Sequence, residues 1–117
     1  MFDKRDPLLY IQDILESIDA IKNYTDSINY EQFSSDRKTY SACIREFTII
    51  GEAIGKIFNL CMTYSPDYEW RMIKDFRNII VHEYFGIDLK IVWDLIQFEL
   101  QSLANEITHI KRSISQN

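Results

Sequence analysis

The residues best suited to chemistry lie in one octapeptide, residues 77–84, which reads Arg-Asn-Ile-Ile-Val-His-Glu-Tyr. An arginine can hold a phosphate through two parallel hydrogen bonds, and a histidine can transfer protons near neutral pH. Tyr84 adds a hydroxyl that can itself be modified. Arg77, His82 and Tyr84 together therefore suit chemistry at a phosphate. Any one of them alone would be an ordinary polar helix residue, which usually only faces water.

The order of these residues resembles the R-x4-6-H motif of the HEPN superfamily, and Asn78 is the polar residue that the motif has after its arginine. Tyr84, two residues after His82, makes the narrower R-x4-H-x-Y pattern of the HepT-like toxins. The similarity also covers flanking segments across most of the chain: Ile50-Gly51-Glu52-Ala53, Pro66, Trp70, Tyr84-Phe85-Gly86-Ile87-Asp88 and Val92-Trp93.

The resemblance implies an all-α bundle of four to five helices that acts as a homodimer and cleaves RNA without a metal or other cofactor. Such a protein is the toxin of a type VII toxin-antitoxin pair. Its partner would be a minimal nucleotidyltransferase (MNT) antitoxin that attaches AMP to Tyr84. Arg77 and His82 would be catalytic, with Asn78 supporting them. The family points to transfer RNA or messenger RNA as substrate, and the sequence does not choose between them.

The implied reaction follows from the residue types. His82 would take the proton from a ribose 2′-hydroxyl or deliver one to the departing 5′-oxygen, while Arg77 stabilises the charge on the phosphate. The nucleophile belongs to the substrate, so no metal is needed to supply it. The products should carry a 2′,3′-cyclic phosphate, and DNA should survive because it lacks the hydroxyl.

The spacing of the motif is awkward within one regular helix. Arg77 and His82 are five residues apart, so they differ by about 140° around the helix axis. Either the helix loosens near His82, or two subunits related by a twofold axis assemble the site together. Asn78 lies one turn before His82 and is placed to orient its imidazole; the alternative is that Asn78 makes only ordinary surface hydrogen bonds.

The net charge argues against extensive nucleic-acid binding. Eighteen acidic residues against thirteen basic ones give −5, whereas proteins that hold many phosphates usually present a basic face. A small basic focus at Arg71, Lys74 and Arg77 could still contact a few phosphates. The charge favours a second hypothesis, in which the chain is a non-catalytic helical dimer that binds a nucleotide or docks a nucleotidyltransferase.

Composition predicts a single helical domain over residues 1–117. Only 3 glycines and 2 prolines punctuate the chain, which favours long helices over many short strands. The sequence shows neither a long apolar run nor an apolar leader, so we expect a soluble, cytoplasmic protein. Cys43 and Cys61 fit no metal spacing and are predicted to be core residues rather than a disulfide.

Helical periodicity predicts the first two long elements. The first helix should begin with Asp6 as N-cap and Pro7 in its first turn, and should run to about Ile28. Residues 29–36 lack periodicity and are predicted to be a connection. Ser34 or Ser35 should cap the central helix, which is predicted over residues 36–62.

Two glycines in the central helix, Gly51 and Gly55, lie four residues apart on one face. Each costs helix stability of about 1 kcal/mol against alanine. A close approach of another helix, within the subunit or across a dimer, would explain them. Glu52 between them could help in an active site, although a structural or solvent-facing role is the usual one for a helical glutamate.

The remaining elements surround the motif. The sequence breaks at Ser65-Pro66, and a shorter helix is predicted from about Tyr68 to Glu83, ended by Gly86. Asp88 should cap a last helix from Leu89 to near Ser113. We assign no catalytic role to His109, which lies beside basic residues near the end of that helix.

Overall fold

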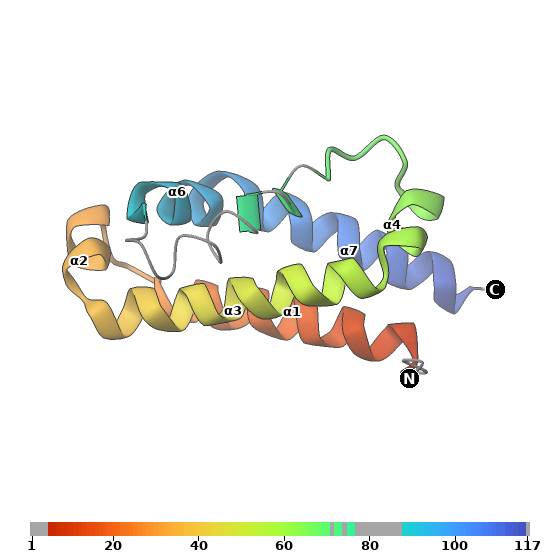
Figure 1. Ribbon diagram of the computed structural model, residues 1–117, viewed down its shortest axis with the longest axis horizontal. Helices are drawn as coiled ribbons and strands as arrows, with labels where there is room; N and C mark the ends of the chain where they lie inside the picture. The colour runs from red at the N-terminus through yellow and green to blue at the C-terminus, as the bar shows by residue number, and fades with distance from the viewer. Residues whose placement is uncertain (1–4, 71, 74, 77–87, 117) are drawn as a thin grey trace.

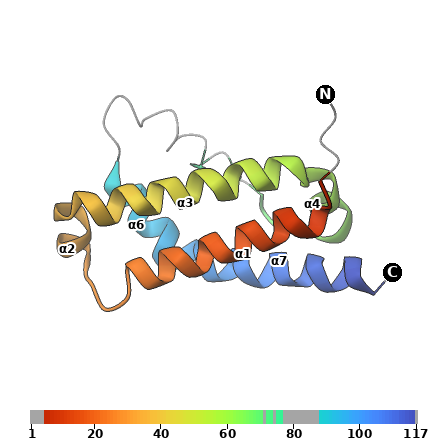
Figure 2. The same cartoon turned by 90° about the horizontal axis from the view of Figure 1, so that it is seen from below.

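The computed structural model describes residues 5–70, 72–73, 75–76 and 88–116, and the regular structure of these residues is all helical. Two long helices, α1 (Pro7–Tyr24) and α3 (Arg37–Lys56), lie side by side, and α7 (Leu100–Ser115) packs along α1 (Figures 1 and 2). The predicted all-α class is therefore confirmed. None of the helices in the described part is long and apolar enough to cross a membrane.

One apolar core lies between the three long helices. It is built from buried stripes of apolar residues that recur at helical spacing. Their members are Ile11, Ile14, Ile18 and Ile21 of α1, then Cys43, Ile44, Phe47, Ile50 and Ile54 of α3, and Leu100, Leu103, Ile107 and Ile110 of α7.

The start of α1 agrees with the prediction and its end does not. The carboxylate of Asp6 accepts a hydrogen bond of 2.9 Å from the amide of Leu8, and Pro7 occupies the first turn. The helix ends at Tyr24 rather than near Ile28. A turn follows in which Ser27 has a φ of 63°, a left-handed conformation that a right-handed helix cannot contain.

Residues 29–36 were predicted to be a connection, and this is wrong, because they include the short helix α2 (Tyr30–Ser35). The side chain of Asn29 accepts from the amide of Gln32, and the side chain of Gln32 accepts from the amide of Asn29. This reciprocal cap gives a six-residue helix enough stability to place Phe33 in the core. It begins with asparagine rather than the more familiar serine or threonine.

Asp36 caps α3, in place of the predicted Ser34 or Ser35. Its carboxylate accepts from the hydroxyl of Thr39 at 2.7 Å and from the amide of Thr39 at 3.4 Å. These hydrogen bonds favour the ionised form and lower the pKa of Asp36. Both serines instead donate their hydroxyls to carbonyls within α2.

The predicted central helix is divided in two. It stops at Lys56, and α4 (Phe58–Tyr64) follows after a break at Ile57. The break turns the chain so that Ile57 and Cys61 are both buried in the core. Gly55, which lies just before it, weakens the local preference for helix. The predicted break at Ser65-Pro66 is confirmed, since α4 ends at Tyr64.

The last predicted helix is continuous in extent but not in type. Asp88 caps α6 (Leu89–Asp94) as predicted, by accepting from the amides of Lys90 and Ile91. A π-helical turn, η1 (Leu95–Glu99), then leads directly into α7. The apolar periodicity of this segment gave no sign of the π turn.

Both cysteines are core residues, as predicted. Cys43 and Cys61 are fully buried and neither is in a disulfide. Burial raises the pKa of each thiol to about 12, so both remain protonated near neutral pH.

Candidate functional site

The four predicted site residues, Arg77, Asn78, His82 and Tyr84, lie outside the residues that the structure describes. Arg71 and Lys74, the other members of the predicted basic focus, also lie outside them. The roles and mutual arrangement of these residues therefore stay predictions. What the structure describes is the framework on both sides of the motif in the sequence.

Phe76, the residue immediately before Arg77 in the sequence, is anchored in the core. It is buried and its ring packs against Phe47 of α3, with the ring centroids 5.2 Å apart. On the same helix, a β-carbon added to Gly51 would lie 3.3 Å from the β-carbon of Phe76. The close approach predicted from Gly51 is thus confirmed, and it occurs within the subunit.

Gly55 does not share that role in the described part of the chain. A β-carbon added there would have no neighbour within 4 Å among the described atoms outside its own helix. Glu52, between the two glycines, is exposed, in agreement with the solvent-facing role. The sequence pattern treated the two glycines alike, but only Gly51 faces the segment that leads to the motif.

Aromatic side chains hold the segment before Phe76 in place by a hydrogen bond and by packing. The indole of Trp70 donates a 3.0 Å hydrogen bond to the carbonyl of Ser65, and its ring lies against Tyr68 at a centroid distance of 4.7 Å. Ser102 of α7 donates its hydroxyl to that of Tyr68 at 3.4 Å. Burial raises the pKa of Tyr68. These contacts join the turn after α4 to α7.

The helix predicted to begin at about Tyr68 begins later. Residues 66–70 form turns and bends, and helical backbone is described at Met72, Ile73, Asp75 and Phe76. The bond from Trp70 to the Ser65 carbonyl holds residues 65–70 as a turn, which delays the helix. The predicted end at Glu83 and the stop at Gly86 lie outside the described residues.

Beyond the motif, the chain is anchored again at α6. Asp88, four residues after Tyr84 in the sequence, caps this helix, and Val92 is buried. The indole of Trp93 packs on the ring of Phe33 of α2 at 5.1 Å and meets Tyr30 edge-on at 6.1 Å. An aromatic cluster therefore fixes α6 against α2.

The π turn that follows carries the most exposed large apolar side chain of the described residues, Phe98, which is 75% exposed. Such turns frequently occur at functional sites.

The histidine of α7 makes a contact between two helices. His109 lies on α7, where its Nε2 is 3.2 Å from the carbonyl oxygen of Tyr64, so it links α7 to the end of α4. In the described part of the chain, no group of three or more histidine, cysteine, aspartate or glutamate side chains is arranged to hold a metal ion.

Comparison with known proteins gives a match across most of the sequence. Residues 14–110 match the family described as Ribonuclease HepT-like, a range that includes the octapeptide. A protein named "Probable ribonuclease HepT" from Thermococcus cleftensis is 34% identical, over 93% of this chain and 99% of that protein. "Putative RNase MJ0127" from Methanocaldococcus jannaschii is 31% identical, over 95% of this chain and 89% of that protein. No solved structure matches the chain significantly.

The two glycines of α3 offer a matched test of the packing before the motif. Gly55→Ala should raise the free energy of unfolding by about 0.5–1 kcal/mol, because alanine is the better helix former. Gly51→Ala gains the same helix preference but presses its methyl group against Phe76. We expect it to be less stable than Gly55→Ala by at least about 1 kcal/mol. Urea denaturation followed by circular dichroism at one protein concentration measures both; equal stabilisation would contradict the role given to Gly51.

Proposed function

The chain belongs to the HepT-like ribonuclease family, and on that premise we propose that it is a metal-independent endoribonuclease whose reaction is carried by Arg77 and His82. The observation that carries the proposal is that the family match spans residues 14–110 and so contains the whole Arg-Asn-x3-His-x-Tyr motif. The two similar proteins from Thermococcus cleftensis and Methanocaldococcus jannaschii are named as a probable ribonuclease and a putative RNase. RNA is the substrate that follows from those names.

The reaction is an internal transfer of the phosphate within the RNA chain. His82 accepts the proton of the ribose 2′-hydroxyl as that oxygen attacks the neighbouring phosphorus, or donates a proton to the departing 5′-oxygen. Arg77 stabilises the negative charge that grows on the phosphate oxygens. One strand ends in a 2′,3′-cyclic phosphate and the other begins with a free 5′-hydroxyl. Asn78 orients the imidazole of His82 and selects its tautomer.

The framework around the motif supports this proposal. A catalytic group must be held close to its productive geometry by packed neighbours. The motif is preceded directly by Phe76, which is packed on Phe47 and Gly51, and is followed closely by the cap at Asp88. Rigid anchors on both sides are what a site in the intervening residues needs.

We also propose that the active form is a homodimer with composite sites. The five-residue spacing between Arg77 and His82 separates them by about 140° on a regular helix. An arginine from one subunit and a histidine from its partner would remove that difficulty, and a twofold axis would create two such sites. A dimer would also bring positive charge from two chains to one place.

The partner in this proposal is a minimal nucleotidyltransferase, which makes the pair a toxin and its antitoxin. Transfer of AMP to the phenol oxygen of Tyr84 would place a negative phosphate beside the motif. That phosphate would compete with RNA for Arg77 and would fill the space that the substrate needs. Modification would thus inhibit by charge and by bulk together.

A second candidate function is favoured by one observation, the net charge of −5. In this alternative the chain is a non-catalytic helical dimer that binds a nucleotide or docks the nucleotidyltransferase, because few phosphates can be held by an acidic protein. Cleavage of RNA by the pure protein separates the two functions.

For the catalytic pair, pure protein in excess EDTA should cleave single-stranded RNA and leave cyclic-phosphate ends, while DNA of the same sequence stays intact. His82→Ala and Arg77→Ala should each reduce the cleavage rate at least about 100-fold. His109→Ala is the matched control, because it removes the other histidine, which bonds the Tyr64 carbonyl. Thermal melts should show all variants folded. Equal background cleavage by wild type and His82→Ala would refute the ribonuclease proposal.

Mixing two inactive variants tests whether each site is shared between subunits. In a mixed dimer of Arg77→Ala and His82→Ala, one composite site would retain both an intact arginine and an intact histidine. Random reassociation should therefore restore about one quarter of the wild-type activity. If both groups act within one subunit, every site in the mixture lacks one of them, and activity stays at the level of the single variants.

Co-expression with a minimal nucleotidyltransferase tests the role of Tyr84. Intact-mass measurement should show one or more added AMP units on the wild type, together with loss of toxicity. Tyr84→Phe should gain none and should escape neutralisation. Tyr24→Phe, which removes an exposed phenol of α1, is the control and should still be modified. Neutralisation of an unmodified wild type by a tight complex would show that the partner only blocks the site.

A further inference from the structure

The phenyl ring of Phe98 stands out from the π turn into solvent. It is 75% exposed, whereas the other exposed large apolar side chains in the described part of the chain are between 40% and 43% exposed. A π turn closes hydrogen bonds over five residues instead of four, so it redirects the side chains that follow it. The most exposed ring therefore lies where the helix departs from regular geometry.

The exposed side chains around this ring carry no charge. In the described segment 95–105 they are Gln97, Phe98, Gln101, Ser102 and Asn105. Residues three or four apart are neighbours on a helix, and Gln101 donates a 2.9 Å hydrogen bond to Asn105, so these five residues form one surface, the Phe98 face. The centre of a protein interface has the same character, since aromatic residues are enriched there and charged ones are depleted.

Charged groups lie at the edges of the Phe98 face. Lys22 of α1 donates a hydrogen bond to the side chain of Gln101. Two carboxylates, Glu99 and Glu106, are within electrostatic reach of Tyr68, whose hydroxyl borders the face. A polar rim around an uncharged centre is the usual arrangement of a protein interface.

The net charge of the chain indicates which partner fits this face. Each copy carries −5, so two copies repel each other unless they meet where carboxylates do not oppose one another. A foreign protein would not be limited in this way, because a basic one could bind to an acidic surface. In a twofold dimer the same patch serves both subunits, so an uncharged face with an aromatic centre suits contact with a second copy.

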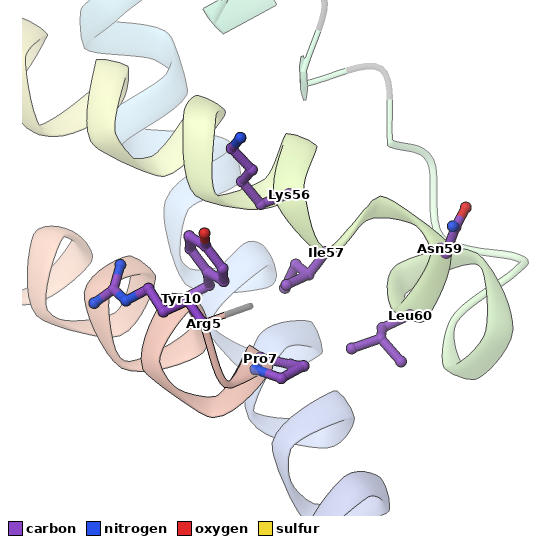
Figure 3. Close-up of a pocket in the computed structure, with 7 residues that line it drawn as sticks. All are labelled: Arg5, Pro7, Tyr10, Lys56, Ile57, Asn59 and Leu60. Atoms are coloured by element: carbon purple, nitrogen blue, oxygen red, sulfur yellow. The ribbon is translucent and has the colours of Figure 1, made fainter. Parts of the chain in front are cut away.

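The exposed apolar residues of α4 have different surroundings. Helix α4 carries the exposed Phe58 and, together with the start of α1, lines a cavity of about 290 Å³ (Figure 3). Two charged side chains, Arg5 and Lys56, belong to that lining. This region lies at the end of the bundle away from α6 (Figure 1). Phe98 instead lies on the helical segment that starts at Asp88, soon after the motif.

From these features we infer that the Phe98 face is the centre of the contact between two copies of this chain. The inference rests on the proposed homodimer and adds where its twofold axis passes, beside η1 and the start of α7. Stable interfaces bury about 1,200–2,000 Å² in total, so the contact would extend beyond the five residues of the face. Each ring would pack on the face of the other subunit.

Sedimentation equilibrium of the full chain at micromolar concentration tests this contact. The wild type should have the mass of two chains and Phe98→Asp that of one, because the substitution would place two carboxylates in the contact. Phe58→Asp is the matched control, since it makes the same change at an exposed phenylalanine of α4 and should leave the dimer intact. Thermal melts should show both variants folded, because both rings are exposed.

Gln97→Glu tests the need for an uncharged face while leaving the ring in place. It should weaken association at least about tenfold at low ionic strength, and added salt should recover part of the loss by screening the like charges. This variant also decides the question if Phe98→Asp does not fold.

The outcomes separate this inference from the proposed function. If folded Phe98→Asp stays dimeric, the inference is overturned and the proposed homodimer stands. A monomeric wild type would overturn both, and if such a monomer bound a nucleotidyltransferase only with Phe98 intact, the face would belong to that partner. Full RNA cleavage by a monomeric Phe98→Asp would support this contact and refute the composite sites.

Discussion

The contact between Phe76 and the bare backbone at Gly51 is the constraint on which the rest of the site framework depends. Glycine lets a buried aromatic side chain approach α3 closely, because a β-carbon at this position would lie 3.3 Å from that of Phe76, which is tighter than most such contacts. Phe47, one turn before Gly51, packs against the Phe76 ring as well. The longest core helix thereby fixes the residue that leads into the motif by packing.

The ends of the helices are set by short polar side chains, whereas their faces are set by apolar ones. Asp6, Asn29, Asp36 and Asp88 each accept a hydrogen bond from a backbone amide in the first turn of a helix. These caps decide where the chain changes direction, and the buried stripes decide which way each helix faces. Both kinds of residue occur in α6: Asp88 caps the helix, and its aromatic residue Trp93 packs on α2.

The sequence predicted the all-α class, the apolar faces and the caps at Asp6 and Asp88, because these follow from periodicity and from single residues. It missed α2, the break at Ile57 and the π turn. In α2 the reciprocal Asn29–Gln32 cap outweighed the lack of periodicity, and at Ile57 the burial of two apolar residues outweighed helix continuity. At the site, the roles and arrangement of Arg77, His82 and Tyr84 stay predictions, because these residues lie outside the described part of the chain.

The acidic charge limits how this chain can hold RNA. A protein that neutralises many phosphates gains affinity by releasing counterions, and that route needs a broad basic face. If a chain of net charge −5 binds RNA, it must rely instead on a few local contacts, such as the proposed arginine of the motif. Few phosphate contacts mean a shallow dependence of affinity on salt. The proposed recognition of RNA would therefore depend on a few specific contacts more than on the total negative charge of the RNA.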